Sequence, residues 1–238
     1  MFLTPTSCST NSISAKSTPP TTSTTAETSA TTTTSAVTGM PCADPNVQAQ
    51  YSQELQKIQE ADQADRAWQV QGEQPNPKIL EKMSKNDLVR RKRVGEIFGE
   101  GCLKTAADYE AAFIVYQHGN TSDQYFQAFV WSKKALTLGD SHVKGDVAMA
   151  VDRYLVSIGH KELFGTQATE SALGGCWCIQ PVEESFPAKF REEYRGGLNA
   201  SYTGLPYLKV LNKGNNCPEA YCDSKLQPSP KGTVPGFW

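Results

Sequence analysis

The chain has 238 residues and a formal net charge of -2 at pH 7. This balance points to neither nucleic acid nor an anionic membrane as a partner. No apolar run approaches the roughly 18 residues of a membrane-spanning helix, so we expect a chain that does not span a membrane and holds one or two domains.

The N-terminal segment differs from the rest of the chain. Ser and Thr make up 22 of the first 40 residues, and only Lys16 and Glu27 are charged there. Such a segment cannot bury enough apolar surface to offset its ordering entropy, and its composition is typical of an O-glycosylated stalk. The sequence therefore predicts a disordered tail over 1–41 and a helical domain over 42–238.

Five helices are expected in the first part of the domain. Asp44-Pro45 supplies an N-cap and a first helical residue, and glycines at 119, 139 and 159 end later helices. The predicted ranges are 46–71, 79–99, 105–119, 122–138 and 141–158. The third helix is apolar all round over 111–116, which indicates a buried helix.

The last three helices are similar in length and joined by short loops. This pattern resembles antiparallel hairpins of the tetratricopeptide or Sel1-like kind, but no clean repeat period is present. We therefore expect an all-α compact bundle of antiparallel helical hairpins with a core over 44–167. Residues 168–238 are rich in Gly, Pro, Asn and Cys, and predict an irregular extension with one short helix near 188–194.

Six of the seven cysteines lie in the domain, and Cys8 lies in the tail. An even number predicts a disulfide framework in an oxidising compartment involving Cys42, Cys102, Cys176, Cys178, Cys217 and Cys222. The Cys-x-Cys pair would bond outward, for example to Cys217 and Cys222, which would leave Cys42 with Cys102. The alternative is a Cys₄ zinc site at the four C-terminal cysteines, although the spacing is short for it.

Two sequons support a secreted glycoprotein, with glycosylation expected at Asn120 and Asn199. The first residues lack the apolar stretch of a signal peptide, so we expect a mature extracellular chain whose signal has been removed. The alternative is a cytosolic protein with free thiols.

Charged residues fall on apolar helix faces. Asp152 shares a face with Ala148, Val151 and Leu155, His118 ends the face of the third helix, and the first helix places Asp62 and Asp65 on one face beside Arg66. Buried charges are costly unless paired, so these groups are expected to meet, with Arg153 next to Asp152. The competing interpretation is a purely structural cluster that ties the helices together. The basic run 90–93 is expected to be a solvated helix face.

Four short motifs occur in order: Asp62-Gln63-Ala64-Asp65-Arg66, Gln117-His118, Asp152-Arg153 and Phe164-Gly165-Thr166-Gln167. Over roughly 60–170 the chain resembles an uncharacterised, mainly bacterial helical domain family with the pattern D-x-x-D-R, Q-H, D-R and Y-G-T-Q. Phe164 replaces the usual Tyr, and Glu162 stands where the family tends to have Gln. The resemblance implies a site at these motifs and assigns it no reaction.

These observations favour an acid–base enzyme that acts on a small substrate by hydrolysis, elimination or cyclisation. His118 would move a proton, with Asp152 or Asp65 to orient it. Substrate-binding groups would be Arg153, Arg66, Gln167 and Thr166. No phosphate loop or metalloprotease motif occurs, so neither a cofactor nor a metal is expected. The alternative function is a non-catalytic extracellular binding or interaction module.

Overall fold

The computed structural model describes residues 41–67, 76–170, 175–195, 204–213 and 216–238. The predicted tail over 1–40 and the sequon at Asn199 lie outside these ranges. The first helix was predicted to run to 71, but it ends at Ala64.

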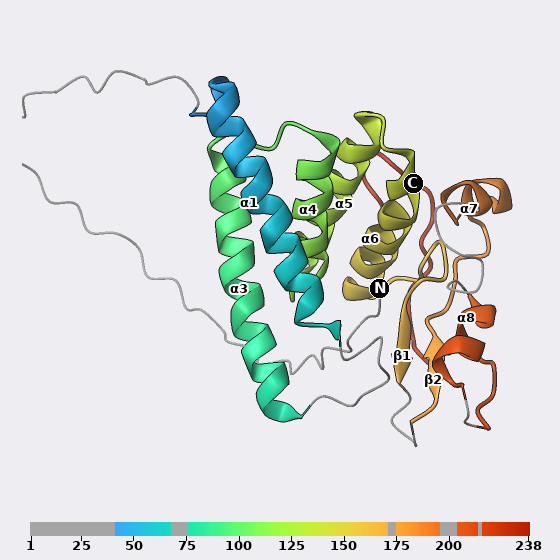
Figure 1. The fold of residues 1–238 in the computed structure, drawn as a ribbon. Helices are drawn as coiled ribbons and strands as arrows, with labels where there is room; N and C mark the ends of the chain where they lie inside the picture. The colour runs from blue at the N-terminus through green and yellow to red at the C-terminus, as the bar shows by residue number, and fades with distance from the viewer. Residues whose placement is uncertain (1–40, 68–75, 171–174, 196–203, 214–215) are drawn as a thin grey trace, which may run out of the picture.

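Two long helices, α1 (Pro45–Ala64) and α3 (Pro77–Gly99), lie side by side along one edge of the bundle (Figure 1). Both begin with a capping side chain and a proline. Asp44 accepts a hydrogen bond from the N–H of Asn46 at 2.8 Å, and Asn76 accepts one from the N–H of Ile79 at 3.0 Å. Each cap satisfies a backbone donor that has no partner inside the helix, so the start of α1 is as predicted and α3 begins two residues earlier than predicted.

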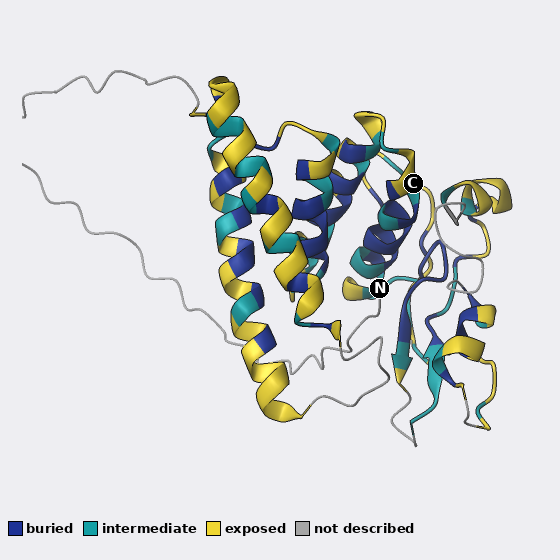
Figure 2. Cartoon of the chain, viewed as in Figure 1, coloured by how far each residue is buried: buried dark blue, intermediate teal, exposed yellow. Residues whose placement is uncertain are grey.

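The centre of the bundle consists of α4 (Ala106–Gln117), α5 (Ser122–Thr137) and α6 (Lys144–Ser157), with a 3₁₀ turn (Ser141–Val143) before α6. Helix α5 packs against both α4 and α6, and α1 packs on α4. All residues from Ala111 to Val115 are buried (Figure 2), which confirms the prediction of a buried helix. This core holds the C-terminal end of α4 close to both α1 and α6, where the candidate site lies.

The C-terminal part is less irregular than predicted. Strands β1 (Ala168–Glu170) and β2 (Trp177–Ile179) pair antiparallel, with Thr169 opposite Cys178. Helix α7 (Ala188–Arg195) forms where a short helix was expected, and α8 (Leu205–Leu211) was missed. The chain is thus mostly helical but not all-α. The two strands were not predicted because three residues are too few for alternating polarity to reveal a strand.

Three disulfides crosslink the domain. They join Cys42 to Cys102, Cys176 to Cys217 and Cys178 to Cys222. The first ties the start of α1 to the end of α3, and the other two fasten β2 to the segment after α8. The cysteines therefore form the predicted disulfides and not the alternative zinc site, and such bonds are typical of an oxidising compartment.

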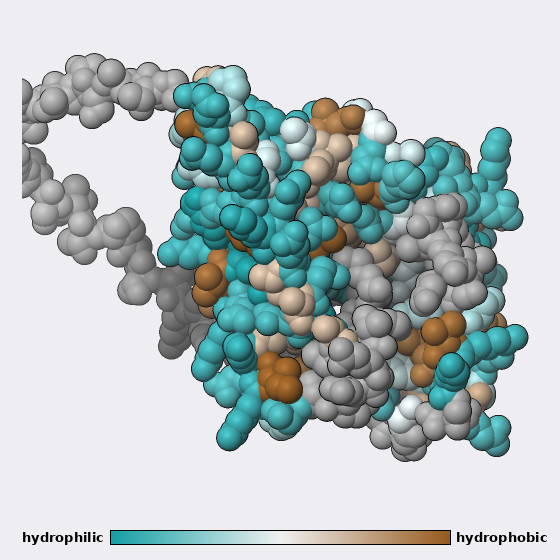
Figure 3. All heavy atoms as spheres, viewed as in Figure 1, coloured by the Kyte–Doolittle hydropathy of each residue, from teal (hydrophilic) through white to brown (hydrophobic). Residues whose placement is uncertain are grey.

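The described helices are each too short or too polar to cross a bilayer. On the face drawn in Figure 3, the described surface over α1 and α3 is mostly hydrophilic, with apolar side chains in separate spots. Single exposed apolar residues of this kind are normal for a folded surface.

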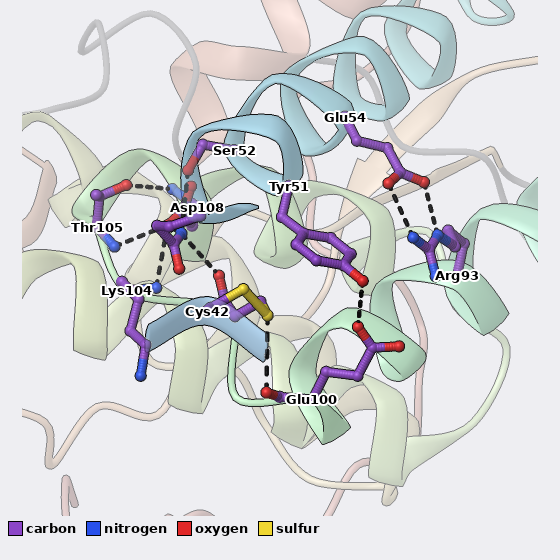
Figure 4. Close-up of a disulfide and its surroundings, with 11 residues drawn as sticks. Cys42, Tyr51, Ser52, Glu54, Arg93, Glu100, Lys104, Thr105 and Asp108 are labelled. Atoms are coloured by element: carbon purple, nitrogen blue, oxygen red, sulfur yellow. Dashed lines mark hydrogen bonds and ion pairs between the residues drawn. A yellow bond between two sulfur atoms is a disulfide. The ribbon is translucent and has the colours of Figure 1, made fainter. Parts of the chain in front are cut away.

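A capping box fixes the start of α4 (Figure 4). The Thr105 hydroxyl accepts a hydrogen bond from the N–H of Asp108 at 3.1 Å, and the Asp108 carboxylate accepts one from the N–H of Thr105 at 2.8 Å. The same carboxylate lies 3.2 Å from the amide nitrogen of Gln48 on α1. The cap therefore sets both the start of α4 and its contact with α1.

Replacing Thr105 by Ala should lower the free energy of unfolding by about 1 kcal/mol, since one helix N–H loses its acceptor. Urea denaturation measures this change. Thr105→Ser keeps the hydroxyl and is the matched control, so equal losses in both variants would contradict a capping role.

Candidate functional site

Charged side chains from three helices converge inside the bundle. They come from the C-terminal end of α1, the middle of α3 and the C-terminal end of α4. The buried charged residues here are Asp62, Arg66, Asp87, Arg90 and Arg91, with the imidazole of His118 beside them. Because each lies on the inner face of its helix, the packing that forms the core also forms this cluster.

His118 is the C-cap residue of α4, and its ring contacts α1. Nδ1 lies 2.8 Å from Oδ2 of Asp62, and the His118 side chain is 4% exposed. The His118 backbone carbonyl accepts a hydrogen bond from Nη1 of Arg91 at 2.9 Å. Within the described residues, the buried Nε2 has no hydrogen-bond partner. Both the ring and its backbone are therefore held in place, while one ring nitrogen is left over.

Two arginines hold three aspartates together. Arg66 contacts Asp62 at 3.0 Å and Asp87 at 2.7 Å. Arg90 contacts Asp87 at 2.6 Å and Asp65 at 2.8 Å. These charges satisfy one another across α1 and α3, as buried charges must.

The prediction of a solvated basic face over 90–93 was wrong for two of its residues. Arg90 and Arg91 are buried, whereas Arg93 is partly exposed and binds Glu54 at 2.6 Å. The signal was present in the sequence, because Asp87, Arg90 and Val94 follow the inner-face spacing of a helix.

Arg153 on α6 reaches the same helix end from the opposite side. Its Nη1 donates to the backbone carbonyl of Gln117, and its Nε lies 3.2 Å from Oε1 of Gln167. The guanidinium also lies 5.9 Å from the centre of the Tyr125 ring. Arg153 thus joins the end of α4 to the loop after α6 through neutral acceptors.

Asp152 belongs to a separate buried group. Its carboxylate accepts hydrogen bonds from the N–H groups of Leu163 (2.7 Å), Phe164 (3.0 Å) and Thr166 (3.0 Å), and from the Thr166 hydroxyl (2.8 Å). Glu162 accepts from the N–H of Thr166 as well, at 3.0 Å. Two buried carboxyl groups therefore share one donor and shape the loop that carries Gln167.

The electrostatics give these groups different protonation states. Burial lowers the pKa of His118 and outweighs its contact with Asp62, so the imidazole is neutral near pH 7. Burial opposes ionisation of Asp62, but contacts with His118, Arg66 and Arg90 lower its pKa. An ionised Asp62 can only accept, so Nδ1 of His118 carries the proton and Nε2 keeps its lone pair. Burial and the charge of Asp152 raise the pKa of Glu162 well above its usual range.

The sequence-predicted residues separate into two groups. His118 and Arg66 meet through Asp62, which shared the predicted face without an assigned role, and Asp65 pairs with Arg90. The expected contact of His118 with Asp152 or Asp65 is wrong, because the carboxylate on its ring is Asp62. Asp152 and Thr166 bind each other in the loop and Gln167 is buried there, so the hydroxyl of Thr166 is already engaged.

The sequence analysis missed four further residues of the site. Asp87, Arg90, Arg91 and Glu162 all contact its members. Asn120, the described sequon residue, is exposed two positions after His118.

Comparisons with family models, with curated proteins and with solved structures found no match to this chain.

Proposed function

We propose that this protein is a secreted acid–base enzyme in which His118 acts as a general base, oriented by Asp62, on a small substrate. The observation that carries the proposal is the pairing of a buried Asp–His contact with a second ring nitrogen that has no partner among the described residues. A neutral imidazole fixed in one tautomer by a carboxylate is a common arrangement for proton transfer in enzymes.

The tautomer supports this role. The Nδ1–H of His118 donates to Asp62, so the lone pair of Nε2 is available to take a proton. A neutral buried polar atom without a partner costs stability, and a substrate hydroxyl or water bound at Nε2 would recover that cost. Hydrolysis, elimination and cyclisation without a cofactor can each use such a base.

Secretion and glycosylation belong to the same proposal. The three disulfides suit an oxidising compartment, and Asn120 is exposed, as a glycan acceptor must be. The site also supports the earlier resemblance to an uncharacterised helical domain family, because residues of its D-x-x-D-R, Q-H and D-R motifs meet at the end of α4.

His118→Ala should reduce kcat/KM by about 10²- to 10⁴-fold, the usual contribution of a positioned general base. Esters, amides, phosphodiesters and substrates for β-elimination form the panel in which wild-type turnover is sought. Because the pKa of His118 is lowered, the wild-type rate should rise as pH increases through acidic values and then reach a plateau. The midpoint of that rise should lie below about pH 6.5, the usual pKa of histidine. The matched control is His142→Ala, which changes an exposed histidine and should leave turnover unchanged.

A binding module remains the second candidate, and the near-complete burial of the His118 ring favours it. In that case the ion cluster only ties three helices together. His118→Ala would then lower Tm and leave every wild-type activity intact, a result that would overturn the enzymatic proposal.

A further inference from the structure

We infer that Arg153 and Arg91 form, beside His118, the binding site for one oxyanion group of the ligand, a carboxylate or a phosphate. This inference rests on the proposed function and specifies its substrate class. It also narrows the sequence-based expectation, in which Arg153 and Arg66 were both substrate-binding groups.

The first argument is the imbalance of charge in the cluster. Four arginines lie here, but the three aspartates are all engaged by Arg66 and Arg90. Within the described residues, the contacts of Arg91 and Arg153 are to neutral groups. With a neutral imidazole, one positive charge is left without a carboxylate.

The end of α4 does not supply the missing charge. Arg153 and Arg91 donate to its last carbonyls, on Gln117 and His118, where a helix carries about half a negative charge in total. Two whole positive charges share that half charge. Burial lowers the pKa of Arg153 to about 10, so the guanidinium is still protonated at neutral pH, and no described carboxylate contacts it.

The second argument is the presence of unused polar atoms. Nε of Arg91 and Nε2 of His118 are buried and have no partner among the described residues. Arg91 is bonded to the backbone of His118, and the charge of Arg153 acts on the His118 ring. The unused Nε–H donor of Arg91 and the excess positive charge fit an anion, and the planar guanidinium fork suits carboxylates and phosphates in particular. Nε2 of His118 is an acceptor in the tautomer that Asp62 selects, so it would take a proton from the ligand and would not bind its oxyanion.

The contacts also distinguish an arginine that stabilises the fold from one that can bind a ligand. Arg66 is held by Asp62 and Asp87, so its donors serve the fold. Among the residues that the structure describes, the contacts of Arg153 are with a carbonyl, an amide and the ring of Tyr125. A ligand held by its oxyanion at Arg153 would present its neighbouring atoms to the base, a division of labour common in enzyme sites.

The test is titration of the full chain with sodium acetate and, separately, with inorganic phosphate at constant ionic strength. Heteronuclear NMR follows the Nε–H of Arg153 and the ring of His118. Saturable shifts of both signals are expected, and the stronger of the two probes identifies the group as carboxylate or phosphate. Absence of saturation with both probes would overturn the inference without any variant.

Variants locate the binding. Arg153→Gln should weaken it at least tenfold, and Arg153→Lys should weaken it less because the charge stays. Arg93→Gln, which changes a partly exposed arginine bound to Glu54, should leave it unchanged. Equal affinity in wild type and Arg153→Gln would refute the assignment.

One internal competitor is tested in the same series. Apart from Glu27 in the tail, the only carboxylate side chain outside the described ranges is that of Glu73. Binding that appears only in Glu73→Gln would mean that the chain's own carboxylate is the natural partner of Arg153, and would overturn the inference.

This inference and the proposed function can fail separately. Anion binding that persists in His118→Ala, together with turnover that does not depend on His118, would refute the enzyme and keep the anion site. Turnover that depends on His118 while Arg153→Gln leaves KM unchanged would refute the anion site and keep the enzyme.

Discussion

Asp62→Asn is expected to lower the free energy of unfolding by about 3–5 kcal/mol, the usual cost of breaking a buried ion pair by neutralising one partner. Asp62 is completely buried and contacts His118, Arg66 and Arg90. Asparagine has nearly the same shape, so the loss reports charge and not packing. With Asp62 neutral, the three buried arginines of the cluster would have only Asp65 and Asp87 as carboxylate partners among the described residues.

The pH dependence of this loss identifies its origin. Because contacts in the folded state lower the pKa of Asp62, its stabilising effect is present above the unfolded pKa of about 3.9 and is lost as pH falls through the folded value. The difference between wild type and Asp62→Asn in urea denaturation should therefore be full at pH 7 and shrink below about pH 4.

Asp65→Asn is the matched control for position in the cluster. Asp65 is a quarter exposed and pairs with Arg90 and Asn86, so solvent screens its charge and its loss should be the smaller of the two. Equal losses at the two positions, or a loss below about 1 kcal/mol for Asp62→Asn, would contradict a tightly coupled buried network.

The helices could be predicted because each carries its own local signals. Asp44-Pro45 and the Thr105 cap mark helix starts, and Gly139 and Gly159 follow the last residues of α5 and α6 with positive φ. These signals act over a few residues and do not depend on the rest of the fold. The small sheet lacks such signals. Helix α8 has Pro206 in its first turn but is only seven residues long and has no side-chain cap, so contacts with the disulfide-bonded segment help to decide its structure.

The candidate site was only half predictable for a related reason. Helical periodicity shows which side chains face inward, and it placed Asp62, His118 and Asp152 correctly on inner faces. It does not show how far along the bundle each one lies. Asp152 does not contact the imidazole in the structure and instead binds the backbone of the loop over 163–166. Helix α3 supplies buried partners, Arg90 and Arg91, that were expected on the surface.

Asp152→Ala should destabilise the fold by at least about 2 kcal/mol, because it leaves two buried N–H groups without their acceptor, at about 1–3 kcal/mol each. Those groups belong to Leu163 and Phe164, whereas the N–H of Thr166 keeps Glu162 as its acceptor. The loss should open the loop that carries Gln167 but leave the contact between His118 and Asp62 in place, since Asp152 does not take part in it. Urea denaturation gives the stability, and the His118 ring signals in NMR report the contact.

Glu162→Gln supplies the contrast in the same loop. Burial and the charge of Asp152 raise the pKa of Glu162, so the folded state binds a proton that the unfolded state releases above about pH 4.3. The contribution of Glu162 to the free energy of unfolding of the wild type is therefore greatest below that pH. It falls as pH rises toward the pKa of Glu162 in the folded state. Glutamine resembles the protonated acid, so Glu162→Gln should gain stability relative to wild type between pH 4.5 and 8. The contribution of His118 is common to both proteins and cancels from the difference. A difference that stays constant over this range would mean that Glu162 is ionised beside Asp152, and the description of the pair as one carboxylate and one carboxylic acid would fail.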